Sequence, residues 1–282
     1  MTVDRPSPAA ASRKIGLIGL GSMGLGMARS LRRAGFDVAG YDVAKAAVDT
    51  FAAEGGRGAK SLAEVAADAG VVVSVVVNAT QTEAVLFGDN GIAAALRPDA
   101  VFISSATMDP AITRRLAERL EASGRHYLDA PMSGGAAKAN TGELTFMASG
   151  TAAAFAAARP ALDAMAGKIY ELGNSAGAGS AFKMINQLLA GVHIAAACEA
   201  ITFAQKQGLD LQKVYDVITA SAGNSWMFEN RVPHVIAGDY KPLSSIEIFV
   251  KDLGIVQDMA RSARYPVPMA AAALQMYLAA AG

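Results

Sequence analysis

The sequence predicts an α/β domain with a doubly wound sheet, joined by a long helix to an all-α C-terminal domain. Two observations support this prediction. Short apolar runs alternate with helical patterns as far as residue 172, which is typical of a parallel sheet built from βαβ units. Beyond residue 207 the strand signals end and only helical patterns follow. We therefore expect one domain at residues 14–175 and a second at residues 176–282.

The joining segment, residues 177–207, reads as a single helix, because it contains no proline and only Gly191 interrupts its interior. A helix of roughly 30 residues spans about 45 Å. Lys183, Asn186 and Gln187 stand at positions i, i+3 and i+4, so they share one face of this helix. A lysine and two amides in an otherwise apolar helix are the first candidates for function.

The composition is that of a globular protein large enough for two domains. Of its 282 residues, 52% are hydrophobic and 18% are charged, and 25 basic residues balance 25 acidic ones. A net charge of zero favours neither nucleic acid nor an anionic membrane surface as a partner. Composition therefore supports neither of these two classes of partner.

The first 13 residues contain two prolines and no apolar core, so they are expected to form a disordered tail rather than a signal peptide. Cys198 is the only cysteine, which excludes an internal disulfide and fits a reducing compartment. Apolar runs such as Val71–Val77 are too short to cross a bilayer. The expected location is the cytoplasm.

A glycine-rich turn near the N-terminus stands between a strand and a helix. In order, the segment contains an apolar strand (Lys14–Gly19), the turn Gly19-Leu20-Gly21-Ser22-Met23-Gly24, a helix (Leu25–Arg33), a second strand (Phe36–Tyr41) and Asp42. This is the fingerprint of a Rossmann dinucleotide-binding domain in its required context. A flexible turn with no ligand is the alternative, and the flanking strands, helix and acid disfavour it.

Each glycine of the fingerprint has a separate physical role. Gly19 permits the tight turn, Gly21 lets the backbone approach a pyrophosphate, and Gly24 lets the helix pack close to the strand. The amino end of the helix, at Ser22 and Met23, then presents free N–H groups and a partial positive charge to the phosphates. Asp42 would accept hydrogen bonds from both ribose hydroxyls and would repel a 2′-phosphate, so NAD is the expected cofactor rather than NADP.

The rest of the chain continues the same alternation and then becomes helical. Further strands are expected at Val71–Val77, Ala100–Ser105, Tyr127–Ala130, Leu144–Ala148 and Lys168–Leu172. Further helices are expected at Lys45–Glu54, Ser61–Asp68, Thr82–Leu86, Ala111–Ser123, Thr151–Met165, Leu211–Ser221, Trp226–Arg231, Ile248–Ala263 and Val267–Leu278.

Polar residues follow several of these strands. Asn78, Ser105, Thr107 and Ser133 all lie just beyond a strand's carboxyl end, where ligands of open parallel sheets bind. Taken singly, each is more readily explained as an ordinary loop residue. Together they predict one crevice.

The sequence holds no convincing metal site and no Gly-x-Ser-x-Gly nucleophile turn, so we expect the nicotinamide to supply the main chemistry. Lys183 is then the candidate proton carrier, because burial disfavours the charged form of lysine. A side chain that extends from the helix into water is an equal alternative. Two further candidates each have an alternative interpretation without a function. Ser133-Gly134-Gly135 could clamp a carboxylate or form an ordinary turn, and Lys251-Asp252 is by default an exposed charged pair.

Four motifs in order resemble those of the β-hydroxyacid dehydrogenases, a family that includes the 3-hydroxyisobutyrate dehydrogenases. They are Leu17-Ile18-Gly19-Leu20-Gly21-Ser22-Met23-Gly24, Asp129-Ala130-Pro131-Met132-Ser133-Gly134-Gly135 with Gly142, Gly179 followed by Lys183 and Asn186, and Lys251-Asp252-Leu253. The resemblance covers residues 14–280. It implies a Rossmann domain joined by the long helix to a helical domain, and association as a homodimer or homotetramer.

The resemblance also implies roles for individual residues. Lys183 becomes the general acid/base, and Ser133, Gly134 and Gly135 become the carboxylate site. Asn186 positions the substrate, with Gln187 beside it. Thr107 and Lys251 contact the nicotinamide end of the cofactor, which reverses the default reading of Lys251. With the fingerprint, the expected cofactor site comprises Gly19, Gly21, Ser22, Met23, Gly24, Asp42, Asn78, Thr107 and Lys251.

Within this family, residues 187–196 and 222–231 are most similar to the L-threonate dehydrogenases, NAD enzymes that oxidise a small sugar acid to 2-dehydro-L-erythronate (2-oxo-tetronate). This similarity adds Asn224 and Ser225 to the expected substrate site, as polar groups that suit a polyol. Ser244 stands where many relatives carry phenylalanine. Relatives also continue beyond the position of Gly282 through a glycine-rich turn and a further helix.

Three alternatives remain open. The nearest is a dehydrogenase for another small hydroxy acid, such as 3-hydroxyisobutyrate, tartronate semialdehyde or glycerate. An imine reductase would share the fold, but those enzymes usually lack the helix lysine. A non-catalytic dinucleotide sensor is the alternative from a different class, and the presence of Lys183 disfavours it.

Overall fold

The computed structural model describes residues 14–241 and 244–282. The expected N-terminal tail, residues 1–13, lies outside this range. The chain divides into two compact units, and the division falls between Lys183 and Met184. Each unit is described by itself.

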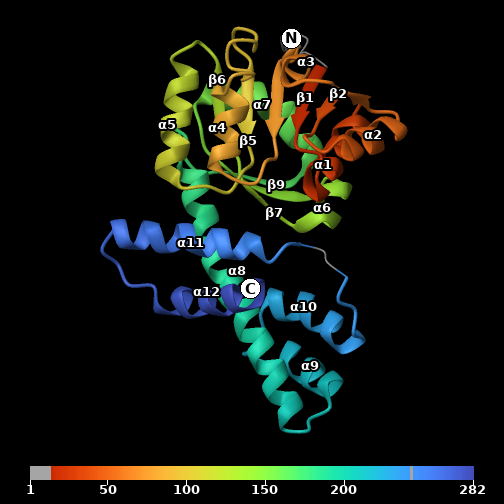
Figure 1. Ribbon diagram of the computed structural model, residues 1–282, viewed down its shortest axis with the longest axis vertical. Helices are drawn as coiled ribbons and strands as arrows, with labels where there is room; N and C mark the ends of the chain where they lie inside the picture. Colours follow the sequence, from red (N-terminus) through yellow and green to blue (C-terminus); the bar gives the residue numbers. More distant parts are fainter. Residues whose placement is uncertain (1–13, 242–243) are drawn as a thin grey trace, which may run out of the picture. The chain divides into compact units, whose positions relative to one another are not determined.

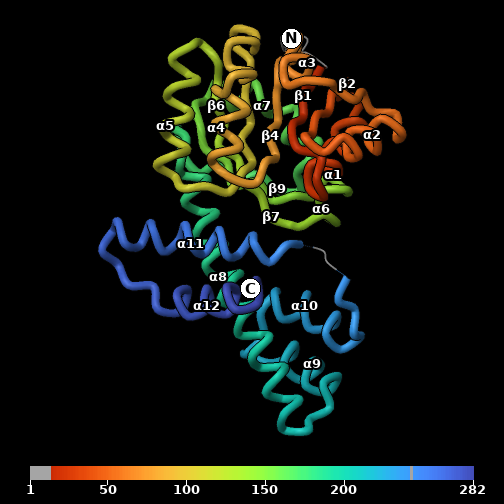
Figure 2. The backbone as a smooth tube through the Cα atoms, viewed as in Figure 1, coloured from red at the N-terminus to blue at the C-terminus, as the bar shows by residue number. Residues whose placement is uncertain are grey.

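The first unit is built on a six-stranded parallel sheet with the strand order β3-β2-β1-β4-β5-β6 (Figure 1). The strands are β1 (Lys14–Ile18), β2 (Asp37–Tyr41), β3 (Arg57–Gly58), β4 (Val71–Ser74), β5 (Val101–Ser104) and β6 (His126–Asp129). β1 pairs with both β2 and β4, so the strand order reverses beside it, and the chain path shows β1 and β4 side by side (Figure 2). Dinucleotides bind at such a switch point. The predicted Rossmann sheet is confirmed.

Both faces of this sheet are buried by helices, because alternate strand residues belong to opposite cores. Val73 and Ile103 pack in one core with side chains of α1, α2 and α7, while Val72 and Phe102 pack in the other with side chains of α3, α4 and α5. The helices are α1 (Ser22–Arg33), α2 (Lys45–Ala53), α3 (Leu62–Ala66), α4 (Ala79–Phe87), α5 (Pro110–Glu121) and α7 (Ala152–Met165). The apolar runs of the sequence are therefore two-sided core strands.

A second sheet of three strands, in the order β7-β8-β9, completes the first unit. It comprises β7 (Met132–Ser133), β8 (Leu144–Ala148) and β9 (Ala166–Glu171), with α6 (Gly135–Thr141) between β7 and β8. β7 runs antiparallel to β8, and β9 runs parallel to it. The strands expected at 144–148 and 168–172 exist, but they belong to this sheet, and the sequence analysis did not predict β3, β7 or α6.

Several expected boundaries were wrong. β4 ends at Ser74 instead of continuing to Val77, and α4 begins at Ala79 because the Asn78 side-chain oxygen accepts a hydrogen bond from Gln81 N and caps the helix. The helix expected to end at Arg231 is α10, which continues through Pro233. Proline is disfavoured inside a helix, and here packing of Val232 in the core overrides that preference.

The second unit is helical. It comprises most of α8 (Ala178–Lys206), with α9 (Leu211–Thr219), α10 (Trp226–Ala237), α11 (Glu247–Ser262) and α12 (Pro268–Ala281). One core joins side chains of α8, α11 and α12, and another joins α8, α9 and α10. The long helix therefore carries both cores of this unit.

The interior glycine of α8 has a packing role. A Cβ at Gly191 would lie 3.0 Å from both methyl carbons of Leu253, so glycine lets α11 pack close to α8. The carbonyl of Gly191 also accepts a hydrogen bond from the Tyr277 hydroxyl at 2.9 Å. Tyr277 thereby joins α12 to the same turn.

By length and composition alone, α8 is apolar enough to cross a membrane. The expectation that every apolar run is too short is therefore wrong for this helix. A core helix of a soluble protein meets the same two criteria, so they are weak evidence for insertion.

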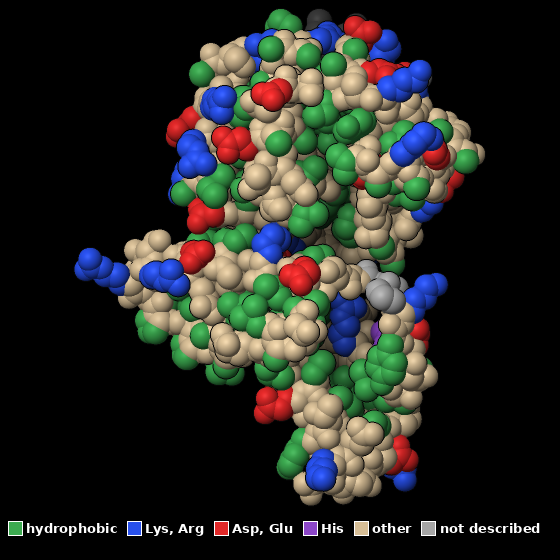
Figure 3. Space-filling model, in the orientation of Figure 1, with side chains coloured by type: hydrophobic (Ala, Val, Ile, Leu, Met, Phe, Trp, Pro, Cys, Tyr) green, Lys and Arg blue, Asp and Glu red, His purple; other side chains and the backbone are tan. Residues whose placement is uncertain are grey.

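On the face of the molecule in view, basic and acidic side chains are interspersed over the first unit (Figure 3).

Candidate active site

The glycine turn between β1 and α1 is closed on one side and open on the other. Gly19 has a φ of +92°, and a Cβ at Gly24 would stand 1.8 Å from Gly19 O, so both positions require glycine. A Cβ at Gly21 would meet nothing within 4 Å. No side chain of the described residues caps the amino end of α1, and Ser22 and Met23 lie in its first turn. Open space beside uncapped N–H groups fits a dinucleotide pyrophosphate.

Asp42 follows β2 and is bonded to the glycine turn. Its Oδ2 accepts a hydrogen bond from Leu20 N at 2.7 Å, and its Oδ1 accepts one from Ala44 N at 2.8 Å. An ionised carboxylate offers about four acceptor positions, so two remain for the hydroxyls of a ribose. The residues at this end of the sheet therefore fit the adenosine half of NAD.

Asn78 and Thr107 lie in the loops after β4 and β5, and both are partly buried. The Oδ1 atom of Asn78 is used as the α4 cap, so its Nδ2 group is the part that remains for a ligand. β4 and β5 are adjacent in the sheet, which brings these two loops to the same edge.

The structure brings Lys183 to the Ser133-Gly134-Gly135 turn. Lys183 is 7% exposed, and its Nζ donates a hydrogen bond to Met132 O at 2.7 Å, one residue before Ser133. The alternative in which this side chain extends into water is therefore wrong. Gly134 and Gly135 have φ values of +135° and +72°, which favour glycine, so the turn could not readily carry other residues there.

A buried carboxylate fixes the start of α8, on which Lys183 is carried. Asp129 is 1% exposed, and its Oδ2 accepts hydrogen bonds from Gly177 N, Ser180 N and Ser149 Oγ. Its Oδ1 accepts one from Ser180 Oγ at 2.7 Å. The pKa of Asp129 is raised above its ordinary value, because the effect of burial outweighs that of the hydrogen bonds from Ser180, Gly177 and Ser149, which lower the pKa. Sequence reasoning missed this role, although Asp129 stood in the quoted substrate-loop motif.

The polar face of α8 continues in the second unit as a hydrogen-bonded chain. Asn186 Nδ2 donates to Gln187 Oε1 at 2.9 Å, and Gln187 Nε2 donates to Asp252 Oδ2 at 2.5 Å. Lys251 Nζ lies 2.7 Å from Asp252 Oδ1. Asp252 is 1% exposed, so the expectation of an exposed charged pair is wrong, because this carboxylate is buried between a lysine and an amide.

Asn224 and Ser225 stand at the start of α10. Ser225 Oγ accepts a hydrogen bond from Phe228 N and caps the helix, and Asn224 Nδ2 donates to Glu229 Oε1. Asn224 Oδ1 is buried and accepts no hydrogen bond from the described part of the chain. Both residues therefore have local structural roles, and the Asn224 carbonyl is the group that lacks a partner.

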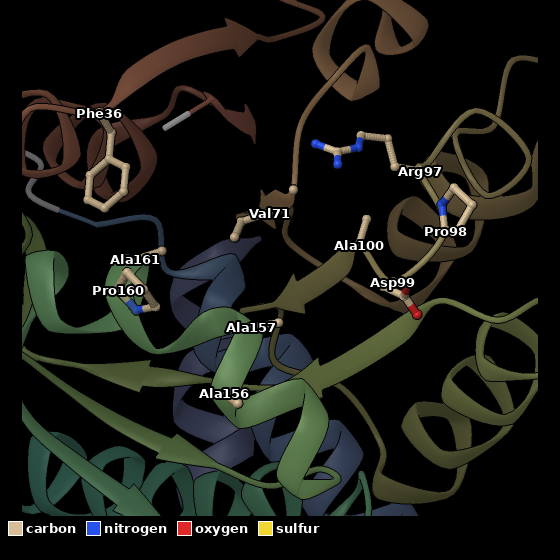
Figure 4. Close-up of a pocket in the computed structure, with 11 residues that line it drawn as sticks. Phe36, Val71, Arg97, Pro98, Asp99, Ala100, Ala156, Ala157, Pro160 and Ala161 are labelled. Atoms are coloured by element: carbon tan, nitrogen blue, oxygen red, sulfur yellow. The ribbon is translucent and has the colours of Figure 1, made fainter. Parts of the chain in front are cut away.

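A cavity of about 360 Å³ opens at the amino ends of the strands of the main sheet (Figure 4). Its lining includes Phe36 before β2, Val71 at the start of β4 and Ala100 before β5, so it lies at the amino ends of the strands. Alanines and Pro160 of α7 form much of the rest of its wall. This cavity is separate from the carboxyl ends of the strands, which Asp42, Asn78 and Thr107 follow.

The fold and the fingerprint define a nicotinamide-dinucleotide-binding oxidoreductase. Two family models match the chain: the NAD binding domain of 6-phosphogluconate dehydrogenase at residues 14–173, and the NAD-binding domain of NADP-dependent 3-hydroxyisobutyrate dehydrogenase at residues 177–282.

Similar proteins agree with these matches. The L-threonate dehydrogenase of Cupriavidus necator is 55% identical over 269 residues, which cover 95% of this chain and 91% of that protein. The L-threonate dehydrogenase of Escherichia coli O6:H1 is 47% identical over 267 residues, which cover 94% of this chain and 88% of that protein. A crystal structure of 3-hydroxyisobutyrate dehydrogenase from Salmonella typhimurium matches with a TM-score of 0.89 and 48% identity, and covers 95% of this chain and 93% of that one. The chain belongs to the β-hydroxyacid dehydrogenase family and is an NAD-dependent hydroxyacid dehydrogenase.

We expect replacement of Asp42 by alanine to relax the discrimination against NADP by about tenfold or more, because the carboxylate that would repel a 2′-phosphate is removed. Asp42→Asn is the matched variant, since its side-chain oxygen can still accept the hydrogen bond from Leu20 N. Dissociation constants for NAD and NADP, measured by calorimetric titration, test this. If both variants keep the ratio of the unmodified enzyme, Asp42 does not contact the ribose.

Proposed function

We propose that this enzyme oxidises L-threonate at C2 to 2-dehydro-L-erythronate, with transfer of the hydride to NAD. The observation that supports the substrate is the 55% identity to an L-threonate dehydrogenase over nearly the whole chain. The observation that supports the chemistry is the buried Lys183 amine beside the Ser133-Gly134-Gly135 turn.

Lys183 is proposed as the general base for this oxidation. In its neutral form, Nζ accepts the proton of the C2 hydroxyl as the C–H bond of C2 breaks and the C=O bond forms. When bound, NAD accepts the hydride. In the reverse direction the lysine, now protonated, returns the proton to the carbonyl oxygen. Because Met132 O accepts a hydrogen bond from Nζ, the amine is held in place in either protonation state.

The substrate carboxylate is proposed to bind at Ser133, Gly134 and Gly135. Backbone N–H groups in a glycine-containing turn can converge on an anion, and the Ser133 hydroxyl adds a further donor. Asn186, with Gln187 beside it, and Asn224 and Ser225 are proposed to form the site for the remaining hydroxyls. The unpartnered carbonyl of Asn224 supports this assignment.

The cofactor is proposed to be held by the residues of the fingerprint and of the adjacent strand ends. These are Gly19, Gly21, Ser22, Met23, Gly24, Asp42, Asn78, Thr107 and Lys251. Residues 14–175 are proposed as the NAD-binding domain, and residues 176–282, beginning with α8, as the helical domain.

We also propose that the enzyme is cytoplasmic and forms a homodimer or homotetramer. Ile185, Leu189 and Phe203 on α8 are 60%, 49% and 64% exposed, which is unusual for large apolar side chains on one helix. Sedimentation equilibrium measures the assembly directly, and a monomer at micromolar concentration would contradict it.

The substrate is tested with a panel of acids and both cofactors, by following the absorbance of the reduced nicotinamide. The panel contains L-threonate, D-threonate, D-erythronate, D-glycerate and 3-hydroxyisobutyrate. We expect the highest kcat/KM with L-threonate and NAD. A preference for 3-hydroxyisobutyrate, the substrate in the name of the Salmonella relative, would support a 3-hydroxyisobutyrate dehydrogenase and overturn the proposed L-threonate activity.

A further inference from the structure

The hydrogen-bonded chain Asn186–Gln187–Asp252 has a direction that its chemistry determines. A carboxylate beside a lysine ammonium can only accept hydrogen bonds, and Asp252 Oδ1 lies 2.7 Å from Lys251 Nζ. Gln187 must therefore turn its NH₂ group toward Asp252 Oδ2, which it reaches at 2.5 Å. Its carbonyl oxygen then faces Asn186.

The same reasoning determines the orientation of the next amide. Gln187 Oε1 is an acceptor, so Asn186 must direct its NH₂ group at it, and the distance is 2.9 Å. Asn186 Oδ1 is thereby left on the opposite side of the amide, where no residue described by the structure donates a hydrogen bond to it. Asn186 is half-buried, so this oxygen is not enclosed in the core.

We propose that Asp252 and Gln187 are positioning residues that make Asn186 a hydrogen-bond acceptor toward the substrate. Asn186 then selects a substrate group that donates, namely a hydroxyl, over a carboxylate or keto oxygen at that position. This inference rests on the proposed function, in which Asn186 contacts the substrate. It explains why a buried carboxylate lies behind an amide pair on α8, and it leaves the substrate carboxylate to a different place, the Ser133-Gly134-Gly135 turn.

The proposal predicts how analogues of L-threonate behave. We would replace each hydroxyl that is not oxidised, one at a time, by hydrogen or by fluorine, which cannot donate. At the hydroxyl that Asn186 recognises, both replacements are expected to lower kcat/KM by about tenfold. A fluoro analogue that keeps the kcat/KM of L-threonate at every position, while the deoxy analogue loses it at one, would show that the protein donates there and would overturn the proposal.

Variants separate the positioning role from general support of the fold. Gln187→Met removes the hydrogen bonds of this side chain with Asn186 and Asp252, so the Asn186 amide is free to turn. The preference, measured as the ratio of kcat/KM for the hydroxy substrate to kcat/KM for the deoxy substrate, is then expected to fall toward one. The control is Gln205→Met, an exposed position on the same helix, which leaves the preference unchanged. Addition of Asn186→Asp to Gln187→Met restores the preference, because a carboxylate accepts in either orientation. An equal loss with both substrates in Gln187→Met, or a double variant without rescue, contradicts the relay.

Neutron diffraction from perdeuterated crystals of the NAD-bound enzyme reads the amide orientations directly. Deuterium on the Asn186 atom that faces Gln187 is the expected result, and the opposite orientation overturns the proposal. This measurement is independent of the substrate. If the unmodified enzyme does not turn over L-threonate, the proposed function fails, while the neutron map still decides the direction of the relay.

Discussion

Replacement of Lys183 by alanine is expected to lower kcat by about 10²–10⁴-fold while the affinity for NAD stays within about twofold, because the variant loses a proton carrier and no cofactor contact. Steady-state kinetics and NAD titration measure the two quantities. The structure supports this separation, since the Lys183 amine is bonded to Met132 O in β7 of the three-stranded sheet, whereas the glycine turn joins β1 of the six-stranded sheet to α1.

Two further variants keep this prediction testable. Lys183→Met retains an apolar stem of similar length, so it limits the cavity that alanine would leave in a site that is 7% exposed. Lys206→Ala removes an exposed lysine from the last turn of the same helix and should keep the kcat of the unmodified enzyme. A kcat within about threefold of the unmodified value in both Lys183 variants would exclude the acid/base role, since proton transfer typically contributes more than that.

Replacement of Asp129 by alanine is expected to lower the free energy of unfolding by about 3–5 kcal/mol, because buried donors lose their acceptor. Two backbone N–H groups, at Gly177 and Ser180, would lose their acceptor. The hydroxyls of Ser149 and Ser180 would lose the same acceptor and keep only their bonds with Gly179 N and Thr113 Oγ1. Urea unfolding followed by circular dichroism measures the loss. The kcat should fall as well, since Ser180 begins the turn of α8 that leads to Lys183.

Asp163→Ala provides the matched control. Asp163 belongs to the same unit, but its ion pair with Arg159 is exposed on α7, so its removal should change the stability by less than about 1 kcal/mol. A loss of the same size in the two variants would mean that the hydrogen bonds of Asp129 contribute no more than a surface pair.

Much of the first unit could be predicted from local sequence. The alternation of apolar strands and helical patterns identified β1, β2, β4, β5 and β6, because strands buried on both faces are continuously apolar. The glycine turn was assigned position by position, since only glycine tolerates the close approach at Gly24 and the positive φ at Gly19. Helical periodicity alone placed Lys183, Asn186 and Gln187 on one face.

Short elements were beyond this kind of reasoning. β3 and β7 are two residues long, and α6 has seven residues, so none of them contains a full period of an apolar pattern. The same limit hid the division of the strands into two sheets, because β8 and β9 have apolar patterns that would suit either sheet.

The sequence by itself determined the fold class, the dinucleotide turn and the family, because these depend on residue types at fixed short spacings. Only the tertiary structure decided which groups hold the candidate catalytic residues. Asp129 bonds Ser180 from 51 residues away, Lys183 bonds Met132 from the same separation, and Asp252 bonds Gln187 across 65 residues. Such pairings arise from the packing of strands and helices distant in the chain, and local periodicity carries no record of them.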